Sequence, residues 1–276
     1  MISSWVFILL NILNMKIAFI SDIHTEFYDR GNYILTDIDQ LPDPDDGDIL
    51  VIAGDFGYFQ HGKYNVAARY LLNKYKNIYD NIYIVPGNHE YYTGSYQGIP
   101  RGINPVEEYD NVFVIKDDKV NLSDDTALYG TTLFSSLDVN LRINSYRLND
   151  FNYIRYNHHL LNPDDMDKIH NDNIKGLKQF IDTDTTDIKI VVSHFPPVPE
   201  IRDINSVKYN NGLDSYFYND ILKEVDNIDS IDYWIYGHNH LNPVKELTIN
   251  GCKFVCNQIG YKHEYTYSNH IKSIDI

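Results

Sequence analysis

Five apolar runs occur along the chain, and each is followed at once by polar residues. The runs span residues 17–20, 49–53, 82–85, 188–192 and 233–236. They contain almost no charged residue, which is typical of strands at the centre of a sheet that is covered on both faces. We therefore predict that they are buried strands. The polar residues then lie at the carboxyl ends of the strands, where open α/β sheets keep their chemistry.

Helical spacing predicts the connections between these strands. An apolar stripe within residues 61–76 indicates a helix that crosses over to the strand at 82–85. The stripe consists of Val66, Ala67, Tyr70, Leu71 and Lys74. Further on, Asn104-Pro105 followed by two glutamates has the form of a helix N-terminus, which predicts a short helix before the apolar run at 112–115.

The second half of the chain begins with shorter β-like runs. From Asp117 these runs, including residues 126–130, indicate a second sheet rather than further crossover helices. Asn162-Pro163-Asp164-Asp165 then predicts the start of a helix that leads to the strand at 188–192. Its expected buried stripe is Met166, Ile169, Asn173, Leu177, Phe180 and Ile181. We expect one more helix at about 213–225 and alternating strands at 244–249 and 253–257.

The residues that follow the five apolar runs are of few kinds. They read Asp22-Ile23-His24, Gly54-Asp55, Gly87-Asn88-His89-Glu90, Ser193-His194 and Gly237-His238-Asn239-His240. Each stretch is weak alone, since a Gly-Asn pair is usually just a turn. In the order DxH, GD, GNHE, SH, GHxH they resemble the motifs of the calcineurin-like metallophosphoesterase family. The resemblance extends from about Met15 to about Tyr261.

The resemblance implies a fold class. The pattern of strands and helices fits a paired sheet sandwich but leaves the arrangement of the sheets open. The family resemblance implies an α/β fold, a four-layer α/β/β/α sandwich of two mixed β-sheets flanked by helices.

The candidate ligands after the strands offer nitrogen and oxygen atoms and no thiolate, a set that suits Mn, Fe or Zn. They are Asp22, His24, Asp55, Asn88, His194, His238 and His240. By resemblance, Asp22, His24, Asp55 and His240 hold one divalent ion, and Asp55, Asn88, His194 and His238 hold the other. Asp55 would then bridge two ions about 3.5–4 Å apart.

The chemistry expected of this site is hydrolysis of a phosphomonoester or a small phosphodiester. Two cations that share an oxygen lower the pKa of a bridging water toward neutrality and so provide a hydroxide nucleophile, with Asp55 holding both ions. His89 lies beside the ligand Asn88, and both this position and the resemblance make it the general acid for the leaving oxygen. We expect Asn88 and Arg147 to contact the substrate, with Arg142 and Arg155 as alternatives in the same segment.

One departure narrows the subgroup. The protein Ser/Thr phosphatases of this superfamily have a GDxVDRG motif after the second strand, whereas this chain reads Gly54-Asp55-Phe56-Gly57. The phosphate-gripping arginine of that motif is missing, so a protein phosphatase is not expected. Residues 130–136 and 257–261 resemble segments of small bacterial-type metallophosphoesterases.

The composition of the chain limits its expected size, cellular location and binding partners. At 276 residues, 43% of them hydrophobic, the chain can bury a large core. We expect one domain at 15–276 with a lid-like insert near 136–163. The formal net charge of −16 argues against a wide basic surface, so the expected partner is a small phosphorylated substrate, not nucleic acid or a membrane. Cys252 and Cys256 are expected to be small core residues, and such sparse cysteine favours a reducing, cytoplasmic location.

Residues 1–14 form an apolar extension that is too short to span a bilayer and lacks the charged start and cleavage site of a signal peptide. We expect this extension to be dispensable. The alternative is that its apolar residues cover a sheet edge or an exposed patch.

Two other functions stay open. A non-catalytic binding scaffold on the same fold is disfavoured because every ligand position is filled, and a nuclease of the same superfamily is disfavoured by the acidic charge balance. Glu90 is expected to orient its neighbours. Histidines that follow no buried strand are expected to make ordinary hydrogen bonds. These are His61, His158, His159, His170, His263 and His270.

Overall fold

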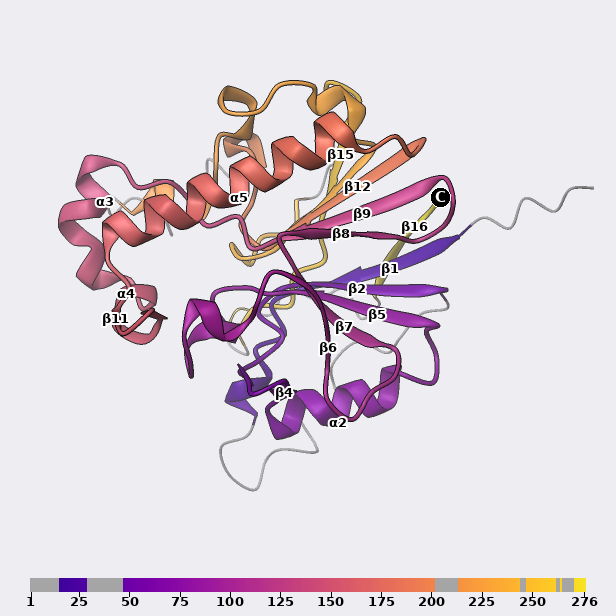
Figure 1. Ribbon diagram of the computed structural model, residues 1–276, viewed down its shortest axis with the longest axis horizontal. Coiled ribbons are helices and arrows are strands. Elements are labelled where there is room, and N and C mark those ends of the chain that lie inside the picture. The colour runs from indigo at the N-terminus through magenta and orange to yellow at the C-terminus, as the bar shows by residue number, and fades with distance from the viewer. Residues whose placement is uncertain (1–14, 29–46, 202–212, 244–246, 262–263, 265–270) are drawn as a thin grey trace, which may run out of the picture.

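Two six-stranded mixed sheets form the centre of the protein (Figure 1). The first has the order β16 (Lys272–Asp275), β1 (Lys16–Ile20), β2 (Ile49–Ala53), β5 (Asn81–Val85), β7 (Val112–Lys116) and β6 (Gly102–Pro105). The second has the order β14 (Leu247–Ile249), β15 (Cys252–Val255), β13 (Tyr233–Ile235), β12 (Ile188–Ser193), β9 (Thr126–Thr131) and β8 (Asp118–Asn121). In each sheet the inner strands are parallel and the edge strands are antiparallel.

The structure, a computed structural model, describes residues 15–28, 47–201, 213–243, 247–261, 264 and 271–276. The predicted extension at 1–14 lies outside these residues, as do His263 and His270. Within them, no helix is long and apolar enough to cross a membrane.

Helices cover the outer face of each sheet, with α2 (Val66–Tyr75) against the first and α5 (Pro163–Thr183) against the second (Figure 1). Alternate residues of one strand pack into two different hydrophobic clusters. In β1, Ala18 and Ile20 join the cluster that contains α2, whereas Ile17 and Phe19 join the cluster between the two sheets. Both faces of the central strands are therefore buried, which explains their continuous apolar runs and confirms the four-layer α/β/β/α fold.

The long helix α5 begins where the sequence predicts. The Asn162 side chain accepts a hydrogen bond from the Asp165 backbone N–H, and the Asp165 side chain accepts one from the Asn162 N–H, so the two form a capping box. The predicted stripe is buried throughout, and its residues are Met166, Ile169, Asn173, Leu177, Phe180 and Ile181. The prediction of the helix and of its inner face is confirmed.

The helix predicted at 61–76 is shorter than expected, and its buried face is rotated. A hairpin of β3 (Phe59–Gln60) and β4 (Lys63–Tyr64) precedes it, because His61 and Gly62 both have positive φ and close a tight two-residue turn. Within α2, Val66 and Tyr70 are exposed. The residues that face the core are Ala67, Ala68, Leu71, Leu72 and Tyr75.

Two further helix predictions are wrong. Asn104-Pro105 lies in the edge strand β6, where the missing N–H of proline is tolerated. Residues 213–225 form short 3-10 turns at Asp214–Phe217 and Ile221–Lys223 instead of a helix. There the backbone N–H of Asn219 donates to Pro196 and that of Ile221 to Pro197, so tertiary contacts use the donors that a helix needs.

The insert at 136–163 contains α3 (Val139–Asn144), α4 (Asp150–Tyr153) and a two-stranded hairpin of β10 (Arg155–Tyr156) and β11 (His159–Leu160). In Figure 1 it lies at the amino-terminal end of α5. Elsewhere, Cys252 and Cys256 are buried free thiols, which confirms their prediction as small core residues.

Candidate metal centre

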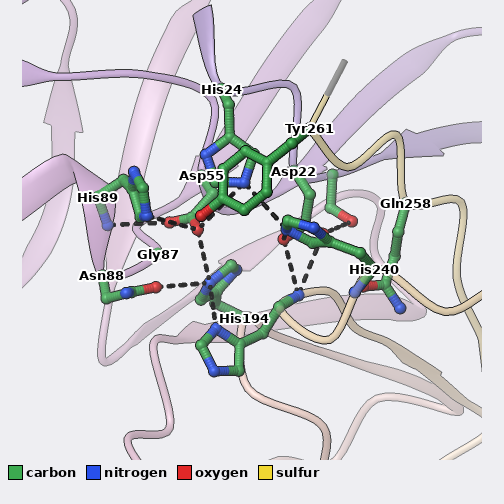
Figure 2. Close-up of polar contacts among 12 residues, drawn as sticks. Asp22, His24, Asp55, Gly87, Asn88, His89, His194, His240, Gln258 and Tyr261 are labelled. Carbon is green, nitrogen blue, oxygen red and sulfur yellow. Dashed lines mark hydrogen bonds and ion pairs between the residues drawn. The ribbon is translucent and has the colours of Figure 1, made fainter. Parts of the chain in front are cut away.

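The carboxyl ends of five parallel strands meet at one place between the two sheets. Asp22 and His24 follow β1, Asp55 follows β2, and Asn88 and His89 follow β5. In the second sheet, His194 follows β12, and His238 and His240 follow β13. The structure thus brings together all the candidate ligands and His89, and Figure 2 shows most of them around Asp55.

Most candidate ligands have backbone torsions in the left-handed region. They are Asp22 (φ 56°), His24 (φ 52°), Asp55 (φ 50°), His238 (φ 77°) and His240 (φ 54°). Residues other than glycine rarely adopt this conformation, and strain of this kind costs roughly 1–3 kcal/mol per residue. The turns after the strands are therefore strained in a way that directs these side chains toward one another.

Two glycines of the motifs allow ligands to approach the neighbouring backbone. A Cβ atom on Gly54 would lie 2.4 Å from His194 Nδ1, and one on Gly87 would lie 2.2 Å from Asp55 Oδ1. Real Cβ atoms do not come this close to another heavy atom, so both positions require glycine. The glycines of the GD and GNHE stretches thus permit the close packing of the site.

The first ligand group contains Asp22, His24 and His240. His24 Nε2 lies 3.0 Å from His240 Nε2, and His240 Nε2 lies 3.4 Å from Asp22 Oδ1. Asp55 Oδ2 lies 3.8 Å from His24 Nε2 and so borders this group.

The second ligand group contains Asn88, His194 and His238. His194 Nε2 lies 3.1 Å from Asn88 Oδ1 and 3.2 Å from His238 Nδ1. The same nitrogen lies 3.3 Å from Asp55 Oδ2. Asp55 Oδ2 therefore faces both groups, as a bridging carboxylate must.

These spacings fit divalent ions. Ligand atoms about 2.0–2.2 Å from one ion lie about 3–3.5 Å from each other. Two ring nitrogens 3.0 Å apart, as in His24 and His240, repel unless a proton or a cation lies between them. Burial lowers the pKa of His24. Burial also acts to lower the pKa of His240, but hydrogen bonds with Asp22 and Glu264 outweigh it and raise that pKa to about 9. One proton between the rings is the simplest state without metal, and a cation can replace it.

In three of the candidate histidines, the second ring nitrogen contacts a carboxylate or carbonyl oxygen, as the outer nitrogen of a metal-bound histidine usually does. The pairs are His24 Nδ1 with Glu26 Oε1 at 3.2 Å, His194 Nδ1 with the Ala53 carbonyl at 2.9 Å, and His240 Nδ1 with Glu264 Oε2 at 2.5 Å. His238 differs, since its buried Nε2 has no hydrogen-bond partner among the described residues and its ring stacks on Phe195. Its Nδ1 is thus the atom engaged in the ligand group.

His89 is held by a carboxylate. Its Nδ1 lies 2.6 Å from Glu26 Oε1, and its Nε2 lies 3.9 Å from Asp55 Oδ2. Burial lowers the pKa of His89, but the charges of Asp55 and Glu26 outweigh it and raise the pKa to about 9. Burial opposes ionisation of Glu26 as well, yet its hydrogen bonds with His24 and His89 lower its pKa to about 2. His89 also forms a ligand-type cluster with His24 and Asp55, so geometry alone permits it to bind an ion.

Glu90 joins the turns after β2 and β5. Its carboxylate accepts hydrogen bonds from the backbone N–H groups of Asp55, Phe56, Gly57 and Gly87, at 3.1, 2.8, 3.3 and 2.7 Å. Glu90 therefore orients its neighbours, as expected from the sequence.

A pocket of about 360 Å³ opens in front of the ligand groups. Its lining includes Asp55, Asn88, His89, His238 and His240 on the ligand side. Arg147, Leu148 and Asn149 line it from the insert. Of the other two candidate arginines, Arg142 pairs with Asp164 and Asp167 at the start of α5, and Arg155 is exposed on β10. Arg147 is thus the predicted arginine that borders the site.

Sequence reasoning missed three carboxylates that contact the candidate site. Glu26 and Glu264 hold ligand histidines, and Asp150 contacts the side-chain amide of Asn88. Glu26 lies two residues after His24, so its position beside the DxH motif was a signal that could have identified it. The other two come from segments whose pattern carries no signal of chemistry. By contrast, His159 and His170 make the ordinary hydrogen bonds expected of them, to Asp165 and to Phe134 and Glu224.

Comparisons with known proteins show which proteins this chain resembles. The chain is 28% identical over 278 residues to an uncharacterized protein of Acanthamoeba polyphaga mimivirus, covering 94% of this chain and 96% of that protein. Its fold is similar to that of phosphopantetheinyl hydrolase from Mycobacterium tuberculosis, with a TM-score of 0.65, 17% identity and 95% of each chain covered. The model of a family described as calcineurin-like phosphoesterase matches residues 15–242. This chain belongs to the calcineurin-like phosphoesterase family.

Proposed function

We propose that this protein is a two-metal phosphoesterase that hydrolyses a phosphomonoester or a small phosphodiester. The observation that carries the proposal is the convergence of two ligand groups on one oxygen, Asp55 Oδ2, beside an open pocket. Membership of the calcineurin-like phosphoesterase family supports the reaction type.

In this proposal the first ion is held by Asp22, His24, Asp55 and His240, and the second by Asp55, Asn88, His194 and His238. The nitrogen and oxygen donors suit Mn, Fe or Zn. Such a pair of ions supplies a strong nucleophile at neutral pH and neutralises charge on the phosphoryl oxygens.

His89 would supply the proton that the leaving oxygen needs. Its Nδ1 contacts Glu26, so Nε2 is the nitrogen that can donate toward the pocket that His89 lines. Asp55 and Glu26 outweigh burial and raise the pKa of His89 to about 9, which favours the protonated imidazole that a general acid needs. The insert would act as a lid, and Arg147 would bind a phosphate oxygen with its guanidinium group.

A screen of the metal-loaded protein tests this function. The purified chain, reconstituted with Mn, Fe or Zn, is assayed on p-nitrophenyl phosphate, bis-p-nitrophenyl phosphate, cyclic nucleotides and single-stranded DNA, with the metal content measured in parallel. We expect two ions per chain and hydrolysis of a small phosphoester that a chelator abolishes. Asp55→Asn serves as the control against a contaminating phosphatase.

Other outcomes of the screen would favour the alternatives. Two bound ions without hydrolysis of any phosphoester would favour a binding scaffold. Cleavage limited to single-stranded DNA would favour a nuclease, against the charge balance. A chain that binds fewer than two ions would overturn the proposal of a two-metal enzyme.

A further inference from the structure

Asp150 is a fully buried carboxylate from the insert that contacts a candidate metal ligand. Its Oδ1 accepts hydrogen bonds from Asn88 Nδ2 at 2.8 Å and from the Tyr92 hydroxyl at 2.8 Å. Its Oδ2 accepts one from the Tyr216 hydroxyl at 2.5 Å. The proposed mechanism gives this carboxylate no task, although a buried charge is costly unless its partners compensate it.

The protons of this cluster can be counted one by one. The side-chain amide of Asn88 has two, and its Nδ2 contacts two acceptors, Asp150 Oδ1 and the Tyr92 hydroxyl oxygen, the latter at 2.9 Å. The hydroxyl protons of Tyr92 and Tyr216 both go to Asp150. Every proton is used once, with Asp150 acting only as an acceptor.

This count fixes which way the amide of Asn88 points. The two ends of an amide have almost the same shape, so their hydrogen-bond partners decide the orientation. In the reversed orientation, Asn88 Oδ1 would face the Asp150 carboxylate and the NH2 group would face His194 Nε2. In the orientation observed, Oδ1 lies 3.1 Å from His194 Nε2 and belongs to the second ligand group. Only the oxygen of an amide can bind a cation.

We propose that Asp150 is a positioning residue that holds the oxygen of Asn88 toward the second metal ion. The insert then completes the metal centre in addition to lining the pocket. This inference rests on the proposed two-metal function. It extends that function because a residue outside the five motifs determines the affinity of one ion.

Metal titration tests the proposal without measuring activity. In Asp150→Asn, residue 150 can present either end of its own amide, so the reversed orientation of Asn88 no longer meets a carboxylate. We expect one of the two ions to bind about 10–100-fold more weakly, the usual effect of losing a partner of a metal ligand, while the other ion keeps its affinity. Competition with a coloured chelator gives both affinities, and thermal melting shows that the variant is folded.

Repeating the substitution in an Asn88→Asp variant shows whether Asp150 acts by orienting the amide. Asn88→Asp has a symmetric carboxylate that needs no orienting. In that background Asp150→Asn removes only the charge of residue 150, so it should weaken the second ion clearly less than it does beside Asn88. Equal weakening in both backgrounds, or unchanged affinities in Asp150→Asn alone, would overturn the proposal.

Asp138→Ala is the matched control. Asp138 caps α3 of the insert and accepts hydrogen bonds from Leu141 N–H and the Ser215 hydroxyl, but it does not contact Asn88. Equal weakening of the ion in this control would assign the effect to the insert's folding and refute the role of Asp150. If Asp150→Asn fails to fold, Tyr92→Phe removes the other acceptor of the Asn88 amide and should weaken the same ion.

The two proposals fail in different ways. If the unmodified chain binds fewer than two ions, the proposed function fails, and the role of Asp150 with it. If the chain binds two ions and Asp150→Asn binds them equally well, only the role of Asp150 fails.

Discussion

Replacing His89 separates proton donation from metal binding. In His89→Ala the ligand groups keep all their members, so both ions should stay bound. Loss of a general acid typically slows the reaction by about 10²–10⁴-fold, or about 2.7–5.5 kcal/mol, when the leaving oxygen must be protonated. An alkyl phosphate has such a leaving group. p-Nitrophenolate leaves without much protonation, so the loss on p-nitrophenyl phosphate should be clearly smaller.

The contacts of His89 indicate that its surroundings favour the protonated imidazole that this role requires. Asp55 and Glu26 raise the pKa of His89 to about 9, which favours its protonated form at pH 7. The acid must hold its proton, so activity should fall as the pH rises through the pKa of His89. In Glu26→Gln one of the two carboxylates that raise the pKa of His89 is gone, while Asp55 remains. The alkaline fall in activity should therefore move to lower pH, and a profile that does not move would contradict the Glu26 contact as its cause.

His170→Ala is the matched control for His89→Ala. His170 is also buried and makes two hydrogen bonds, to the Phe134 carbonyl at 2.8 Å and to Glu224 at 2.9 Å, but it lies outside the pocket lining. Its loss should lower stability without changing the ratio of the two activities. Equal losses on both substrates in His89→Ala would refute the general-acid role. Loss of an ion in that variant would instead make His89 a ligand.

Three other predictions follow from the structure. Asp55→Asn should lose both ions, because one oxygen faces both ligand groups, and elemental analysis that finds one ion retained would contradict the bridge. Removal of residues 1–14 should leave the melting temperature nearly unchanged, since Met15 already pairs with Ile276 through two backbone hydrogen bonds, and a drop of many degrees would show that the segment belongs to the core. Burial lowers the pKa of Lys116 to about 7 against about 10.4 in the unfolded chain, so the unfolded state holds the extra proton between these values. Stability should therefore rise with pH across this window by up to about 1.4 kcal/mol per unit, and Lys116→Met should flatten that rise in denaturant titrations.

The strands and the convergence of the candidate ligands could be predicted from the sequence because one signal marks both. A strand buried on two faces reads as an apolar run, and its carboxyl end is where the polar ligands follow, as at Ile52 and Asp55. The helix α5 was predictable for a similar reason, because Asn162 and Asp165 form its cap within the local sequence. In each case the information lies in neighbouring residues.

The errors arose where distant contacts decide the local structure. The backbone N–H of Asn219 donates a hydrogen bond to the Pro196 carbonyl, and the spacing of apolar residues within 213–225 gives no sign of this distant contact. At His61 a tight turn interrupts a stretch whose apolar spacing imitates a helix. Asp150 is a similar case at the site, because its proposed role depends on a hydrogen bond from Asn88, which is 62 positions away along the chain. Such partners become visible only when the fold brings them together.

The placement of the site between two sheets explains how its strain is tolerated. The first sheet carries Asp22, His24, Asp55 and Asn88, and the second carries His194, His238 and His240. Hydrogen bonds already join the two sides, because the Asp22 carboxylate accepts one from the His238 N–H at 2.9 Å and the Ser21 N–H after β1 donates to the Asn257 carbonyl after β15. The apolar layer between the sheets therefore holds the strained turns opposite each other before any ion arrives. Because each proposed ion would take ligands from both sheets, its binding free energy would add to the packing that holds the sheets together.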